Sequence, residues 1–288
     1  MRALLLALAL PAAAVGDAAA YSLPVRVGPV ALKGLYAPMA GPARDASFRF
    51  PRAGWLTGYS VRLTDAKGES AEDRGVFCHA AVRLKGPAAW RGGTMPERFH
   101  ITLAEGESAF AFPAGFGLAV DTTTRYELAA QLQNGDRRND GAYTFDASFE
   151  VVPAGSSPLK TLSQFLVSAT GPSAGGIASW TAPRGKSSRA SAFEAPATGR
   201  VHRLAFHIHR WATKLSLRDA ASGAVLFESA VENRADGWPA RTPGYSSAEG
   251  LPLVAGRRYE FRADFDVPDE AGADEMAVAR VYFRPDAE

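Results

Sequence analysis

Alternating apolar and polar positions run along most of the chain in short segments, whereas the spacing typical of amphipathic helices is nearly absent. Alternation places successive side chains on opposite faces of an extended strand. The clearest segments are residues 56–63, 76–84, 126–132, 143–151, 201–209, 214–217, 225–227, 258–265 and 277–283. Only residues 159–167 are compatible with a helix. This density of short strands predicts an all-β protein built from antiparallel β-sandwiches.

Pro, Gly and Ser interrupt the pattern near the middle of the chain. Residues 152–158 read Val-Pro-Ala-Gly-Ser-Ser-Pro, a composition typical of a linker between domains. We therefore expect two domains of similar length, residues 21–155 and residues 156–288. Residues 171–189, rich in Gly, Ser and Ala, are predicted to form a second long loop.

The first twenty residues have the pattern of an export signal. Arg2 precedes a short apolar run, and Ala18, Ala19 and Ala20 supply small residues suited to cleavage before Tyr21. The apolar run is too short to cross a bilayer. We therefore predict a signal peptide at residues 1–20, a secreted or periplasmic mature protein, and no membrane attachment after cleavage.

Charge and cysteine content narrow the function classes further. The 32 basic and 30 acidic residues nearly cancel and form no basic run, so nucleic-acid binding has no electrostatic support. Cys78 is the only cysteine, and the chain cannot form an internal disulfide. A single thiol in an oxidising compartment is expected to be buried or bound to metal.

Two histidines at alternate positions provide the strongest sign of chemistry. His207 and His209 share one face of the predicted strand 201–209, and two imidazoles on one face form half of a metal site. Met276 is the expected third ligand, because a soft thioether beside imidazoles favours copper, above all Cu(I). The alternative is that His207 and His209 are ordinary strand histidines and Met276 packs in the core.

Two further histidines are expected to lie outside this site. His202 is separated from His207 and His209 by an odd number of positions, so on a regular strand it faces the other side. His100 has no matching partner and is expected to be a surface residue at a strand end.

These motifs resemble the copper type II, ascorbate-dependent monooxygenases, the family of peptidylglycine α-hydroxylating monooxygenase. The resemblance extends roughly from Ala46 to Phe283. It is carried by Phe-His-Ile-His at 206–209, Asp-Glu-Met at 274–276, the segment 55–63, and Phe-Cys-His at 77–79. It implies two tandem antiparallel jelly rolls with a solvent-filled cleft between them and one copper on each. The second copper, held by an H-x-H pair and a distant methionine, is where the family activates oxygen.

The departures from the family pattern concern the first copper and the substrate. Where the family has two adjacent histidines this chain has Cys78 and His79, and Gln133 stands where a third histidine is expected. The resemblance therefore implies that the first copper site, at Cys78, His79 and Gln133, is eroded. At most, these three residues form a second, weak copper site. Cys78 and His79 suit Cu(I), but adjacent strand residues face opposite ways unless a bulge intervenes. The alternative is a buried thiol beside a surface histidine.

The residues that bind the peptide substrate in the family are also replaced. This chain has Ala205 where the family has an arginine, and Val278 and Arg280 where the family has an asparagine and a tyrosine. These replacements disfavour a peptidylglycine substrate.

Three hypotheses follow. The first is an exported copper protein with one His207/His209/Met276 site that activates oxygen for C–H hydroxylation of a small-molecule or peptide substrate, using an external reductant. The second is a copper carrier or sensor without catalysis. The third is a metal-free interaction module on the same fold. The sequence leaves open whether the protein is an enzyme.

Overall fold

The computed structural model describes residues 19–36, 39–84, 91–97, 100–135, 137–156, 159–172, 179–268 and 274–286. The predicted signal peptide lies almost wholly outside these ranges. Within them the chain is all β, and its only helical segments are the 3₁₀ turns η1 (Glu72–Arg74) and η2 (Arg137–Asn139). No helix in the described ranges is long and apolar enough to cross a membrane.

The first half of the chain forms two facing sheets. One sheet has the order β1-β10-β3-β8-β11, with β7 also paired to β3, and the other has the order β2-β9-β4-β6. Their strands are β1 (Tyr21–Leu32), β10 (Gly141–Pro153), β3 (Gly54–Asp65), β8 (Phe116–Val120), β11 (Lys160–Thr161), β7 (Ala109–Ala111), β2 (Ala43–Phe48), β9 (Tyr126–Leu132), β4 (Phe77–Arg83) and β6 (His100–Ala104). All pairings are antiparallel except that of β11 with β8.

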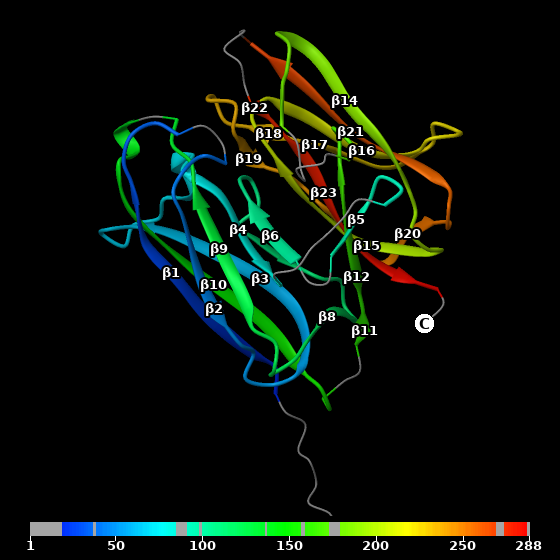
Figure 1. Ribbon diagram of the computed structural model, residues 1–288, viewed down its shortest axis with the longest axis horizontal. Helices are drawn as coiled ribbons and strands as arrows, with labels where there is room; N and C mark the ends of the chain where they lie inside the picture. The colour runs from blue at the N-terminus through cyan, green and yellow to red at the C-terminus, as the bar shows by residue number, and fades with distance from the viewer. Residues whose placement is uncertain are drawn as a thin grey trace, which may run out of the picture.

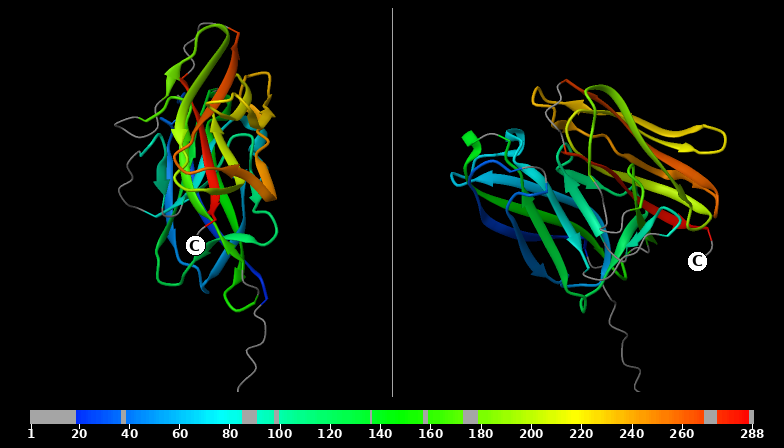
Figure 2. Two further views of the ribbon diagram at one scale, coloured as in Figure 1. Left: turned by 90° about the vertical axis from the view of Figure 1, so that its right-hand side faces the viewer. Right: turned by 45° about the horizontal axis from the view of Figure 1, so that its top comes forward.

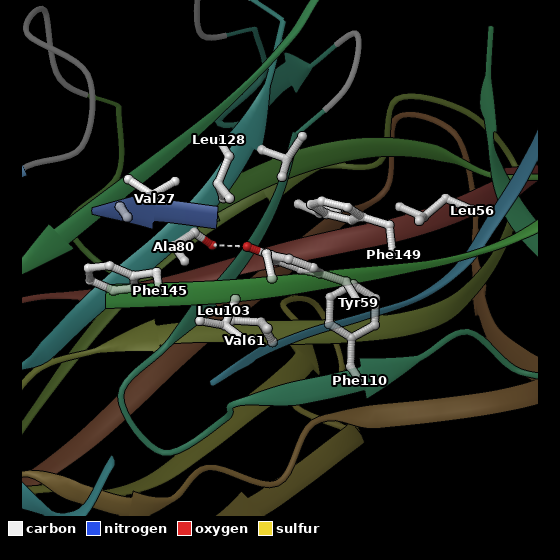
Figure 3. Packing of buried hydrophobic residues seen from close by; sticks show 14 of the residues in the cluster. Val27, Leu56, Tyr59, Val61, Ala80, Leu103, Phe110, Leu128, Phe145 and Phe149 are labelled. Carbon is white, nitrogen blue, oxygen red and sulfur yellow. Dashed lines mark hydrogen bonds between the residues drawn. The ribbon is translucent and has the colours of Figure 1, made fainter. Parts of the chain in front are cut away.

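Aromatic side chains fill the core between these two sheets (Figure 3). Tyr59 of β3 stacks on Phe149 of β10 with ring centroids 4.8 Å apart, and its hydroxyl donates a hydrogen bond to the carbonyl of Ala80 on β4. This bond ties one sheet to the other across the core. A tyrosine buried in this way stabilises the core through its apolar ring, and its hydroxyl group keeps a hydrogen-bond partner.

The second half of the chain also forms two facing sheets, of order β20-β15-β23-β12-β5 and β14-β21-β16-β17. Their strands are β20 (Tyr245–Leu253), β15 (Gly199–Ile208), β23 (Ala277–Pro285), β12 (Ser163–Ser168), β5 (Met95–Glu97), β14 (Gly185–Glu194), β21 (Arg258–Val267), β16 (Ala212–Asp219) and β17 (Val225–Ala230). Two short pairs complete the described strands: β13 (Trp180–Thr181) with β22 (Asp274–Glu275), and β18 (Glu232–Asn233) with β19 (Pro239–Arg241).

The two-sandwich, all-β fold expected from the sequence is confirmed (Figures 1 and 2). Blue-to-green strands form the first sandwich, and the second combines the yellow-green-to-red strands with the green β12 and the teal β5. The first core contains residues from Val27 to Leu162 and the second contains residues from Phe165 to Phe283. The predicted division between residues 155 and 156 precedes this change of core and stays a prediction.

The sandwiches are packed against each other rather than joined only by a linker. β5, from the first half of the sequence, pairs with β12 in the second sandwich. Ala205 and Tyr282, from the second half, are buried in the first core, where Tyr282 lies 5.0 Å from the ring of Phe112. Arg203 of β15 forms a buried ion pair with Glu107 of the first half. These contacts position the facing sheets β4/β6 and β15/β23.

Two local expectations from the sequence are wrong. Residues 159–167 form no helix but contribute β11 and β12, and β12 lies between β23 and β5. Residues 185–189, predicted as loop, begin β14, a largely exposed strand with little hydrophobic patterning. In both cases pairing with distant strands outweighs the local preference, as is common for strands.

Candidate metal centre

Successive side chains of β15 point to opposite faces of its sheet. Leu204, Phe206 and Ile208 enter the second hydrophobic core. His207 and His209, the latter one residue past the strand end, project to the opposite side, toward the first sandwich. Their Nε2 atoms lie 3.3 Å apart. The strand geometry expected from the sequence therefore brings the two imidazoles together.

The 3.3 Å separation suits a shared ion. Taking zinc–imidazole bond lengths of about 2.0–2.1 Å as a guide, two nitrogens on one tetrahedral ion lie roughly 3.3–3.4 Å apart. Burial lowers the pKa of His207 well below its ordinary value, and the neighbouring His209, His79 and Arg280 act in the same direction. The His207 ring is therefore neutral near pH 7 and can offer a lone pair to a metal.

Met276 lies between β22 and β23, next to the end of β15 that carries this pair. Its carbonyl accepts a hydrogen bond of 3.0 Å from the backbone N–H of His209, and its side chain lines the same cavity as His207. The side chain is 6% exposed and also packs with Leu166 and Val278. Met276 thus combines a packing role with a place at the cavity wall, and its role as a ligand stays a prediction.

A cavity of about 290 Å³ separates the facing sheets at this point. The residues of its lining that bear chemistry are Met39, His79, Arg83, His100, Thr102, His207, Met276 and Arg280. They come from both sandwiches, so the cavity exists only because the two halves pack together. Two guanidinium groups and no carboxylate line it among the described lining residues, and one of these groups, that of Arg83, is paired with Glu127 at 3.2 Å. The lining is therefore more favourable to an anion than to a cation.

His79 of β4 forms the opposite wall. Its ring lies 5.5 Å from that of His207, edge to face. Burial lowers its pKa to about 4, with His100 and Arg83 adding to the shift. His100 begins β6 and is the register partner of Arg83 on β4. It is half-buried in the cavity wall and not the surface histidine expected from the sequence.

A bulge brings Cys78 beside His79. The register of β4 against β9 shifts between Phe77 and His79, so Cys78 is the extra residue. Its Sγ lies 3.4 Å from Nδ1 of His79 and 3.8 Å from Sδ of Met39. Burial raises the pKa of the Cys78 thiol to about 12.

Gln133 directly follows β9 and is not the register partner of His79. Gln131, not Gln133, is the β9 residue opposite His79. Its amide donates to the carbonyls of Met39 and Gly41. The side chain of Gln133 is 1% exposed, and neither of its polar atoms has a partner in the described part of the chain. Its role as a weak copper ligand stays a prediction.

A second bulge changes the place of His202. The register of β15 against both neighbours shifts between Val201 and Arg203. His202 consequently stacks on Phe116 of the first sandwich, with ring centroids 3.9 Å apart, and its Nδ1 lies 3.0 Å from the carbonyl of Ser247. The expectation that it faces away from the side of His207 is wrong, because the bulge reverses the alternation.

Across the described ranges, no group of three or more His, Cys, Asp or Glu side chains is arranged to hold one metal ion. A metal held by His207 and His209 therefore needs a donor of another type, such as the Met276 thioether. Of the residues lining the cavity, Met39, His100 and Arg83 had no sequence signal, because their approach depends on strand register.

No protein-family model matches the chain, and no curated protein matches it. Among solved structures it is similar to PNGase F, a glycosylasparaginase from Flavobacterium meningosepticum, at 11% identity and a TM-score of 0.44, covering 91% of this chain and 96% of that one. It is also similar to the cowpea mosaic virus top component, at 9% identity and a TM-score of 0.42, covering 90% and 88%. Similarities this weak carry no argument about function.

Proposed function

We propose that this chain is an exported copper-binding protein whose one mononuclear site is formed by His207, His209 and Met276. The observation that carries the proposal is the 3.3 Å separation of the two Nε2 atoms, with His207 and Met276 both lining the cavity between the sandwiches. The resemblance of residues 206–209 and 274–276 to the copper type II monooxygenases supports the choice of metal. Imidazoles suit both copper oxidation states, and the thioether favours the reduced one.

The chain's own residues define what such a site could act on. A cavity of about 290 Å³ admits a small molecule or the end of a peptide, near the lower limit of ligand pockets. Arg83 and Arg280 on its walls would orient an anionic group beside His207. Bound copper would supply oxygen activation for attack on a C–H bond, with an external reductant.

A copper carrier or sensor is the second proposal. It is favoured by the tight approach of His79 to His207, which leaves only a small cavity beside the H-x-H pair. Ascorbate-dependent oxygen consumption by the copper-loaded protein separates the two: an enzyme consumes oxygen in the presence of substrate, and a carrier does not.

Copper analysis tests the proposal itself. Protein purified without a tag should retain one tight equivalent of Cu(II) per chain, and the variant His207→Gln/His209→Gln should lose it. His202→Gln is the matched control, since that histidine contacts Phe116 and Ser247 outside the cavity. Wild-type protein that retains no copper, or a double variant that retains it fully, would leave the metal-free interaction module as the better account.

A further inference from the structure

A second cleft, of about 490 Å³, also takes its lining from both sandwiches and shares no lining residue with the cavity beside His207. The first sandwich contributes Arg74 of η1 and Arg138 of η2. The second contributes Arg210, from the turn between β15 and β16, and Trp238. Three guanidinium groups that are far apart in the sequence therefore line one cleft.

The guanidinium group of Arg210 is held in place by an aromatic ring and by a sharp turn. Its central carbon lies 5.0 Å from the centroid of the Trp238 ring, over the face of that ring. The next residue, Trp211, has φ of +61°, and its N–H donates a hydrogen bond of 2.8 Å to the carbonyl of Gly237. A bulky residue adopts a positive φ only where its surroundings impose it. The turn and the stacking together fix the direction of Arg210.

The positive charge of Arg210 is not offset within the described part of the chain. No carboxylate there forms an ion pair with it, and its buried Nε has no hydrogen-bond partner. The nearby carboxylates are engaged elsewhere, because Asp65 pairs with Arg74 at 2.9 Å and Asp236 pairs with Arg234 at 3.4 Å. A fixed guanidinium group with hydrogen-bond donors to spare attracts an anion.

We propose that this cleft is a binding site for a small molecule that carries an oxyanion, a carboxylate or a phosphate group, with Arg210 as the principal donor. The planar fork of an arginine donates two parallel hydrogen bonds to such a group. Arg74 and Arg138 add positive charge from the other sandwich. The site uses none of His207, His209 and Met276, so it does not depend on the function proposed above.

Gly135 leaves the space that the guanidinium group of Arg210 occupies. A Cβ added at Gly135 would lie 2.6 Å from Nη2 of Arg210, and the backbone of Gly135 is outside the left-handed region. An alanine at this position therefore meets the end of a side chain and introduces no backbone strain. The variant Gly135→Ala displaces the guanidinium group while every charge of the cleft is kept.

Isothermal titration calorimetry of the metal-free full chain, at low ionic strength, with sodium phosphate and with sodium citrate, tests the proposal. At least one of them should bind as a single saturable equivalent with Kd below about 1 mM, and the tighter one identifies the class of ligand. Arg210→Gln and Gly135→Ala should each weaken this binding at least about tenfold. Arg241→Gln is the matched control, since that exposed guanidinium pairs with Glu232 outside the cleft, and it should leave the affinity unchanged.

The outcomes that would overturn the site are distinct from those that bear on copper. Absence of saturable binding by both anions, or equal weakening by Arg241→Gln, would overturn it. Loss of binding in Arg83→Gln with none in Arg210→Gln would place the anion in the cavity beside His207 instead. If Arg210→Gln does not fold, Gly135→Ala decides, and an unchanged affinity in that variant would contradict Arg210 as the donor. Copper retention by the wild type is measured separately and is independent of all these results.

Discussion

The imidazole of His79 lies 5.5 Å from that of His207, although the two residues belong to different sandwiches. Each ring lies beside a different set of donors, Cys78 and Met39 for the first and His209 for the second. The contact joins the two walls of the cavity. Any change in how the sandwiches pack therefore alters the surroundings of the His207/His209 pair.

Replacement of Met276 by Leu separates packing from metal binding. Because the volume is conserved, the free energy of unfolding should fall by less than about 1.5 kcal/mol. Loss of the thioether should weaken Cu(I) binding at the His207/His209 site far more than Cu(II) binding. Chelator competition in both oxidation states measures the effect.

Met95→Leu is the control for Met276→Leu, because Met95 packs against the same small cluster of Leu166, Met276 and Val278. Equal effects of the two replacements on Cu(I) binding would show that Met276 acts only through packing.

Acid should destabilise the metal-free protein through its buried histidines. The pKa of His79 is about 4 in the fold, whereas an unfolded histidine titrates near 6.5. A depressed pKa contributes stability above the unfolded value that is lost as pH falls toward the folded one. The contribution of His79 to the free energy of unfolding should therefore decline between about pH 6.5 and pH 4, by on the order of 3 kcal/mol. Glu105, whose pKa burial raises to about 8, acts in the opposite direction, so the His79 contribution is read from the difference between the wild type and a variant without this histidine.

The variant His79→Gln tests that assignment, because glutamine does not titrate. The fall in its unfolding free energy from pH 6.5 to pH 4 should be smaller than that of the wild type by the His79 contribution, while His202, His207 and Glu105 still titrate in both proteins. An unchanged slope in this variant would contradict a neutral His79 in the fold.

Removing one partner of the buried ion pair between Arg203 and Glu107 should lower the free energy of unfolding more than replacing both partners with apolar residues. Replacing Glu107 by Leu leaves an uncompensated guanidinium between the sandwiches and should cost about 3–5 kcal/mol. The double replacement Arg203→Met/Glu107→Leu should cost clearly less than the single one. A double-mutant cycle of urea unfolding measures the coupling, and simple additivity would contradict a desolvated pair.

Gly237 supports the turn that follows the histidine pair. An added Cβ would lie 2.4 Å from the ring of Trp211, and φ is +84°. Gly237→Ala should lower the unfolding free energy by at least about 3 kcal/mol, from backbone strain and from the collision together. Gly223→Ala is the control, since Gly223 has φ of +71° with nothing near its Cβ position. It should cost only about 1–2 kcal/mol in the same thermal or urea melts.

The sequence by itself determined the strands and the pairing of His207 with His209. Segments such as 126–132 and 258–265 alternate clearly because each has one face in a core, and the pattern needs no knowledge of the partner strands. The same alternation separates His207 from Phe206 and Ile208, whose apolar side chains can only face the core. A strand of mostly exposed residues, such as β14, gives no comparable signal.

Only the tertiary structure decided which residues face the histidine pair. His79, His100 and Arg83 reach the cavity because β4 and β6 pack opposite β15 and β23, a relation set by the fit of two sandwiches and not by any local pattern. The bulges at Cys78 and His202 likewise depend on register with neighbouring strands. One extra residue in a strand reverses the face of the side chains beyond it, so a strict two-residue period misplaces them.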